Sequence, residues 1–88
     1  MFTMIIEYRK EFCPMCEKLY EELTRRNLTF TTCDLDDSSS IAELYADGVF
    51  PQSAPVLKID DDYYYDATLF LGSNLTDEVI RRIAPDSV

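Results

Sequence analysis

The order of apolar and polar positions predicts alternating strands and helices along the chain. An apolar run at residues 2–8 ends in a cluster of charges and predicts a buried strand. Helical spacing then begins at Pro14, which suits the first position of a helix because proline has no N–H to bond there. The apolar positions of this predicted helix are Cys16, Leu19, Tyr20 and Leu23. Residues 28–35 alternate loosely, are rich in Thr and Phe, and predict a second strand.

The middle of the chain predicts a short helix followed by a hairpin. Ser40, with Glu43 three residues later, has the pattern of a capping box, so we expect a helix from Ser40 to about residue 47. Residues 56–59 and 63–65 predict two antiparallel strands. The acidic residues 60–62 between them predict a tight turn.

A last amphipathic stretch completes the predicted fold. Thr76 precedes it and is expected to cap a third helix. The order β-α-β-α-β-β-α predicts an α/β domain over residues 1–88, with a mixed four-stranded sheet flanked by three helices. Functional sites in such sheets form beyond the carboxyl ends of strands. Cys13 lies at such a place, where the first predicted strand gives way to the first helix.

Composition narrows the chemistry that the chain can perform. Its 88 residues carry a net charge of −9 and include no His and two Gly. Without His there is no Ser-His-Asp or Cys-His nucleophile pair and no Cys₂His₂ zinc site. The isolated Gly48 and Gly72 cannot build a phosphate-binding glycine loop, and the acidic charge argues against nucleic acid as a partner. Of the functions considered, the composition leaves thiol chemistry or binding without catalysis.

The hydropathy of the chain predicts no membrane partner. The first apolar run is too short for the core of a signal peptide, and no later stretch approaches membrane-spanning length. We therefore expect a cytoplasmic protein. In that compartment the three cysteines should be reactive or reduced rather than a structural disulfide framework.

Cys13-Pro14-Met15-Cys16 is the motif that carries chemistry. Thiol exchange needs a thiolate, and the free N–H groups and positive dipole end at a helix start stabilise one. Lys10, three residues before Cys13, adds a positive charge. Cys16 lies one turn into the predicted helix and can reach back to Cys13. We assign Cys13 as the attacking nucleophile and Cys16 as the thiol that resolves a mixed disulfide.

Other roles for the cysteines stay open at this point. A structural zinc site needs four nitrogen or sulfur ligands, so an oxygen ligand or a second chain would have to complete one here. Cys33 lies in the second predicted strand and is expected to face the core as a small apolar residue. A regulatory or metal-binding role is the alternative for Cys33.

The remaining charged and aromatic clusters suit structural roles. The acidic turn lacks the Gly and Glu positions of a calcium-binding EF-hand loop, so we expect a solvated turn. The tyrosines that follow should alternate between the two faces of the sheet, with Tyr64 or its neighbours packing inward; a surface that docks a partner is the alternative. Arg81 and Arg82 suit the negative end of the last helix.

Ala54-Pro55 is a second marker of a site. Proline at the start of a strand cannot donate to the ladder, and it restricts Ala54 to an extended conformation. If the bond is cis, the Ala54 backbone becomes a short edge with which a peptide-like thiol can pair.

These features together resemble the glutaredoxin family within the thioredoxin-fold superfamily. The chain has no Trp before Cys13 and no Gly-Pro inside the motif, unlike a thioredoxin proper. The matching pieces extend over roughly residues 3 to 84 and are the stretch from Tyr8 to Cys16, Leu35-Asp36, Gln52-Ser53-Ala54-Pro55-Val56, and the order of elements.

The resemblance implies thiol–disulfide oxidoreductase activity, a cis Pro55, no bound cofactor, and glutathione as co-substrate along the site. By position, Lys10 is expected to meet a glutathione carboxylate with help from Gln52, and Ala54 to pair with the cysteinyl backbone. Met15 stands where the family often has Tyr.

One stretch departs from the family pattern. After the hairpin, glutaredoxins usually carry Gly-Gly and then an Asp that binds the γ-glutamyl end, whereas this chain has Tyr65-Asp66-Ala67-Thr68. Asp66 or Thr68 would have to take the place of that Asp. The departure favours an alternative: a glutaredoxin-like redoxin that thioredoxin reductase recharges and that serves ribonucleotide reductase. A more distant alternative is an iron–sulfur module shared by two subunits; otherwise we expect a monomer.

Overall fold

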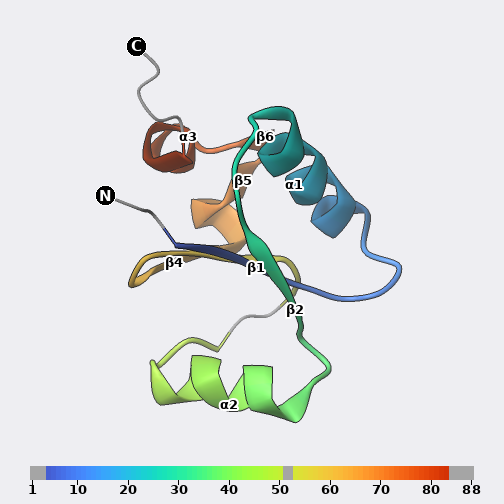
Figure 1. Cartoon of the computed structure of the whole chain (residues 1–88), viewed down its shortest axis with the longest axis vertical. Coiled ribbons are helices and arrows are strands. Elements are labelled where there is room, and N and C mark those ends of the chain that lie inside the picture. The colour runs from blue at the N-terminus through green and yellow to red at the C-terminus, as the bar shows by residue number, and fades with distance from the viewer. Residues whose placement is uncertain (1–3, 51–52, 84–88) are drawn as a thin grey trace.

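A mixed four-stranded sheet forms the centre of the molecule, with the strands in the order β2-β1-β3-β4 (Figure 1). The computed structural model describes residues 4–50 and 53–83. The sheet strands are β1 (Ile5–Arg9), β2 (Thr31–Asp34), β3 (Val56–Ile59) and β4 (Asp62–Tyr65). The helices are α1 (Pro14–Arg25), α2 (Ser38–Ala46) and α3 (Asp77–Ile83). A 3₁₀ turn, η1 (Asp66–Thr68), and a short ribbon of β5 (Phe70–Leu71) and β6 (Asn74–Leu75) join β4 to α3.

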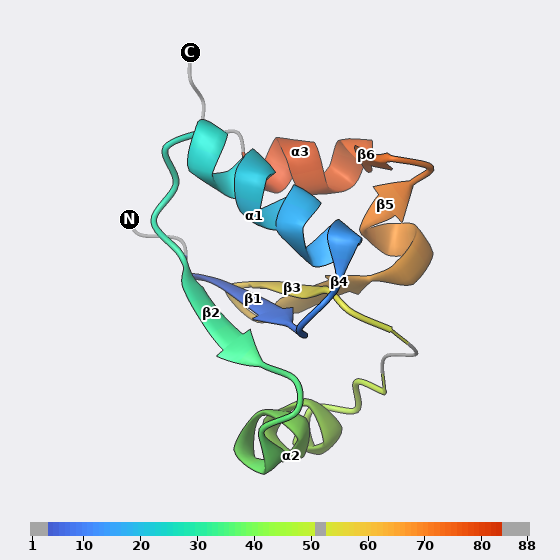
Figure 2. The same cartoon turned by 90° about the vertical axis from the view of Figure 1, so that its right-hand side faces the viewer.

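Strand pairing confirms the predicted fold class. β1 runs parallel to β2, with Ile6 opposite Thr31, and antiparallel to β3, with Tyr8 opposite Val56. β3 and β4 form the predicted hairpin. Helices α1 and α3 cover one face of the sheet and α2 covers the other (Figure 2). The arrangement is the one that the resemblance to the thioredoxin-fold superfamily implies.

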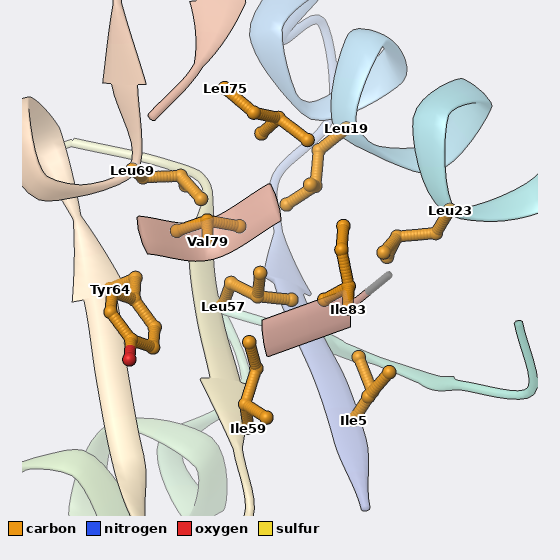
Figure 3. Packing of buried hydrophobic residues seen from close by; sticks show 10 residues of the cluster. All are labelled: Ile5, Leu19, Leu23, Leu57, Ile59, Tyr64, Leu69, Leu75, Val79 and Ile83. Carbon is orange, nitrogen blue, oxygen red and sulfur yellow. The ribbon is translucent and has the colours of Figure 1, made fainter. Parts of the chain in front are cut away.

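The alternation of side chains along the strands divides the core in two. In β3, Leu57 points to the side of α1 and α3, whereas Val56 points to the side of α2. The cluster under α1 and α3 consists of Ile5, Leu19, Leu23, Leu57, Ile59, Tyr64, Leu69, Leu75, Val79 and Ile83 (Figure 3). The cluster under α2 consists of Tyr8, Leu35, Leu44, Val49 and Val56. Burial on both sides makes β3 the central apolar strand of the molecule.

The helix boundaries follow from local capping. Helix α1 begins at Pro14, as predicted, and Thr76 caps α3 as predicted, accepting a hydrogen bond from the Val79 N–H at 3.4 Å. The predicted start of α2 at Ser40 is wrong, because the helix begins at Ser38. The Asp37 carboxylate caps it by accepting the Ser39 N–H at 3.1 Å, which satisfies an N–H group that has no partner inside the helix.

The second predicted strand was too long at its beginning, and the first was too short at its end. The second strand begins at Thr31 rather than at residue 28, because the Leu28 N–H still bonds the Leu23 carbonyl at the end of α1. The first strand extends to Arg9, one residue beyond the predicted end.

Tyr20, expected in the apolar stripe of α1, is instead 41% exposed and packs edge-on against Phe30.

The acidic turn is more than a solvated loop, which corrects the sequence-based expectation. Arg82 of α3 forms ion pairs with Asp60 at 3.7 Å and with Asp62 at 2.6 Å. The Met4 N–H donates to the Asp60 carboxylate at 2.9 Å. The turn therefore ties the beginning of β1 and the last helix to the sheet. Of the tyrosines expected to alternate in β4, Tyr64 is the one that points into the core.

Candidate active site

A disulfide joins Cys13 and Cys16 at the start of α1. β1 ends at Arg9, and the chain then turns through Phe12, whose φ of 54° lies in the left-handed region. This turn brings Cys13 into an extended conformation as the N-cap of α1. The Cα atoms of the two cysteines are 5.2 Å apart, one helical turn along the chain.

The two sulfur-bearing residues differ in their access to solvent. Cys13 is half-buried, whereas Cys16 has no exposed surface. The Cys13 Sγ accepts a hydrogen bond from the Cys16 N–H at 3.1 Å. Because an N–H donor and the helix dipole both favour negative charge, the position suits a thiolate on Cys13 once the disulfide is reduced.

Lys10 lies in the turn before the cysteines and has a partner of its own. Its Nζ is 3.9 Å from an oxygen of Asp36, and the two side chains are 51% and 67% exposed. Exposed ion pairs of this kind contribute little free energy. Lys10 can therefore exchange Asp36 for another carboxylate.

A small cavity of about 130 Å³ lies beside the cysteine pair. It brings together four of the residues expected at the site, namely Met15, Ala54, Pro55 and Asp66, and its other lining residues are Ser53, Leu69 and Phe70. The Ala54-Pro55 bond is cis, as the family resemblance implied. The Asp66 carboxylate is exposed and accepts a hydrogen bond from the Ser53 hydroxyl at 3.1 Å.

Thr68, which was also expected near the cysteines, does not line this cavity. The Thr68 hydroxyl donates to the Tyr65 carbonyl at 2.7 Å and accepts the Tyr65 N–H at 2.9 Å. These two bonds close the turn of η1 and occupy the hydroxyl. Gln52 lies outside the described residues.

A second, wider cavity of about 600 Å³ lies between the turn before the cysteines and β2. Lys10, Phe12 and Cys33 are among its lining residues, and Phe12 is 98% exposed. Cys33 is half-buried against the α2-side cluster rather than fully in the core. Burial, followed by the nearby carboxylates of Glu43 and Asp37, raises the pKa of the Cys33 thiol, so this sulfur is held in its protonated form.

Glu7 is a residue that the sequence-based reasoning missed. Its side chain has no exposed surface, and neither carboxylate oxygen has a hydrogen-bond partner. Burial raises its pKa from 4.5 to about 7; the Arg9 guanidinium opposes this shift and the Glu17 carboxylate adds to it. The signal in the sequence was a lone carboxylate in phase with Ile5 inside an otherwise apolar run.

Within residues 4–50 and 53–83, no three side chains among His, Cys, Asp and Glu gather closely enough to hold a metal ion. No helix in that part of the chain is long and apolar enough to cross a membrane.

Comparison with known proteins connects this geometry to a family. The family model described as Glutaredoxin matches residues 5–64. The crystal structure of the thioredoxin-like protein BC3987 superposes with a TM-score of 0.68 at 21% identity, covering 90% of this chain and 97% of that chain. Glutaredoxin 1 from Francisella tularensis, complexed with cacodylate, superposes with a TM-score of 0.56 at 21% identity, covering 72% of this chain and 81% of its own. Comparison with curated protein sequences gives no match.

Proposed function

The chain belongs to the glutaredoxin family of thiol–disulfide oxidoreductases, and from this premise we propose that it reduces protein disulfides and glutathione mixed disulfides through Cys13 and Cys16. One observation carries the proposal. The disulfide at the start of α1 combines a sulfur on a half-buried residue with a sulfur on a fully buried one. That asymmetry separates an attacking thiol from a resolving thiol.

The reaction proceeds in two exchanges. In the reduced protein, the Cys13 thiolate attacks a substrate disulfide, forms a mixed disulfide with one half, and releases the other half as a thiolate. The Cys16 thiolate then attacks the Cys13 sulfur and releases the second half of the substrate. Two electrons have passed to the substrate, and the Cys13–Cys16 disulfide has formed. The Cys16 N–H and the start of α1 stabilise the negative charge on Cys13 at the beginning of this sequence.

The backbone beside Pro55 supplies a place for the substrate. We expect the cysteinyl residue of the substrate to pair with the backbone of the half-buried Ala54, as an added strand pairs with a sheet edge. Met15, with Leu69 and Phe70, supplies apolar lining to the cavity. Asp66, with its exposed carboxylate, is the group in this cavity that would attract a substrate ammonium.

Glutathione is our first candidate for the thiol that recharges the disulfide. Lys10, weakly held by Asp36, would meet one of its carboxylates, and Gln52 would assist. Asp66 would meet the γ-glutamyl ammonium. Thr68 has a smaller part in this proposal, because its hydroxyl already bonds both backbone groups of Tyr65.

A redoxin recharged by thioredoxin reductase is the second candidate, with ribonucleotide reductase as one substrate. The size of the cavity favours it. At about 130 Å³ the cavity beside Pro55 is smaller than the roughly 300–1,000 Å³ of typical small-molecule pockets. A protein partner needs no such pocket, because it docks over the surface around Cys13.

The experiment measures reduction of a glutathione mixed disulfide, with glutathione and glutathione reductase for recycling, beside the same assay with thioredoxin reductase alone. Turnover with glutathione supports the first candidate, and turnover with thioredoxin reductase alone supports the second. Cys13→Ser should abolish both, whereas Cys16→Ser should keep activity on the glutathione mixed disulfide. Cys33→Ser is the matched control and should behave as wild type.

Two outcomes would contradict the proposal. Equal loss of activity in Cys13→Ser and Cys33→Ser would show that the assigned pair does not carry the exchange. Visible absorbance of an iron–sulfur cluster in freshly purified protein, lost in Cys13→Ser, would instead support the cluster-binding alternative.

A further inference from the structure

The wide cavity between β2 and the turn before the cysteines has no part in the reaction described so far. Its volume of about 600 Å³ lies within the roughly 300–1,000 Å³ of typical small-molecule pockets. β2 contributes Thr32, Cys33 and Asp34 to its lining, and the turn contributes residues 9–12. The wide cavity therefore has room for a long side chain or a short segment of peptide.

This cavity lies beside the attacking cysteine. Phe12, which lines it, directly precedes Cys13 in the chain. Glu17 also lines it, and the Glu17 backbone N–H donates to the Cys13 carbonyl at 3.1 Å. The small cavity beside Pro55 has an entirely different lining. A peptide joined to Cys13 can therefore meet the wide cavity with residues that flank its own cysteine.

Phe12 is the apolar part of this surface. Its ring is almost fully exposed, so it adds nothing to the core of the free protein. Its φ of 54° lies in the left-handed region, which a bulky residue rarely adopts, and such conformations concentrate at binding and active sites. An exposed aromatic ring can cover the apolar stem of a long side chain and attracts a cation to its face.

Both basic residues that line the wide cavity have acidic partners. Arg9 forms ion pairs with Glu17 and with Glu7. Lys10 forms an ion pair with Asp36. Because these partners offset the two positive charges, the basic residues do not make the cavity positive.

Two carboxylates of the cavity have no such partner. Within residues 4–50 and 53–83, no basic side chain forms an ion pair with Glu11 or Asp34, and both residues are exposed. The Asp34 carboxylate accepts the Asp36 N–H at 2.8 Å, a bond that leaves its negative charge in place. The wide cavity therefore combines excess negative charge with an apolar ring.

This combination fits one kind of side chain. Lys and Arg have an apolar stem that can lie on Phe12 and a cationic end that Glu11 and Asp34 attract. An acidic side chain would meet like charge in the same place. We propose that the wide cavity receives a Lys or Arg that flanks the reacting cysteine of the substrate, so that disulfides with basic flanks are the preferred substrates. This inference deepens the proposed oxidoreductase function and rests on it.

The test compares three peptides that differ in charge beside their cysteine. Each has Lys, Gln or Glu immediately before and after the cysteine, which is joined to nitrothiobenzoate, a coloured leaving thiolate. Attack of the Cys13 thiolate on the peptide sulfur forms a bond to the peptide and releases the colour. Each rate is divided by the rate with mercaptoethanol, which removes the peptide's own reactivity. We expect the Lys peptide to react about tenfold faster than the Glu peptide at low salt, and the ratio to shrink in 1 M salt.

Variants locate the effect in the wide cavity. The double variant Glu11→Gln, Asp34→Asn keeps both side-chain sizes and should lower the ratio to about twofold or less. The double variant Glu21→Gln, Asp61→Asn makes the same change in net charge at exposed positions elsewhere, and it should keep the wild-type ratio. Phe12→Ala should slow the Lys peptide about threefold and leave the rate of the Glu peptide near that of wild type.

The outcomes separate this inference from the proposed function. Equal normalised rates for the three peptides with wild-type protein would overturn the preference for basic flanks and leave the oxidoreductase function standing. An equal fall of the ratio in the two double variants would also overturn it, because net charge rather than the cavity would then set the ratio. Release no faster than with Cys13→Ser for all three peptides would contradict the proposed function itself, and the preference would fail with it.

Discussion

Replacing Glu7 by Gln is expected to stabilise the oxidised protein at pH 8 and to change its stability little at about pH 4.5. The carboxylate is fully buried, and its pKa rises from 4.5 to about 7 on folding. Between those values the unfolded chain releases a proton that the folded chain keeps, so the unfolded state binds fewer protons and stability falls as pH rises. Each tenfold change in the ionisation constant corresponds to about 1.4 kcal/mol. Above pH 7 the ionised Glu7 therefore costs about 3 kcal/mol of folding free energy.

The measurement is urea unfolding at several pH values with the Cys13–Cys16 disulfide intact, followed by circular dichroism. The free energy of unfolding of Glu7→Gln minus that of wild type should grow from near zero at about pH 4.5 to about 3 kcal/mol at pH 8. Glu21→Gln, exposed on α1, should show no such pH-dependent difference. A difference that stays constant with pH, or a wild type more stable than Glu7→Gln at pH 8, would refute the reasoning from burial.

Three further predictions concern the elements that hold the site. Leu57→Ala, at the fully buried centre of β3, should lower the free energy of unfolding by about 2–5 kcal/mol in urea; a loss below about 1 kcal/mol would contradict the assigned core. Asp37→Ala removes the cap that accepts the Ser39 N–H and should cost about 1 kcal/mol, whereas an unchanged urea midpoint would mean that the cap contributes nothing. Arg82→Ala breaks the ion pairs to the acidic turn and should cost up to about 1 kcal/mol, less in 1 M salt; a loss independent of salt would argue for packing instead.

Local patterns predicted most of the fold because their causes lie within a few residues of one another. Pro14 can begin a helix but cannot continue one, so the start of α1 was predictable at a single residue. Alternation along the β3–β4 hairpin predicted that tyrosines of β4 face inward, and Tyr64 does so. The start of α2 was misplaced because Asp37 and Ser40 are both good caps, and no local rule decides between them.

The rest depended on contacts between distant segments. The β5–β6 ribbon has two residues in each strand, too few for a hydrophobic period to show. Arg82 reaches the acidic turn across twenty residues of chain, so its ion pairs could not be read from either segment. The burial of Glu7 results from α1 closing over β1, whereas in sequence Glu7 is only a lone carboxylate inside an apolar run.

The residues of the predicted site show the same difference between local causes and contacts made only in the folded chain. The cysteine pair and Pro55 were recognisable because each depends on its immediate neighbours in sequence. The role of Thr68 could not be recognised in this way, because its hydroxyl bonds the backbone of Tyr65 once η1 forms. Asp66, two residues earlier in the same turn, lines the cavity beside Pro55 instead.

The most direct test of the central claim is to identify the sulfur that reacts first. Reduced wild-type protein is treated near neutral pH with less than one equivalent of iodoacetamide, and the alkylated peptide is identified by mass spectrometry. The account predicts that Cys13 carries the label, because it lies at the start of α1 and is the more accessible of the pair. Label found first on the buried Cys16, or on Cys33 to the same extent, would contradict it.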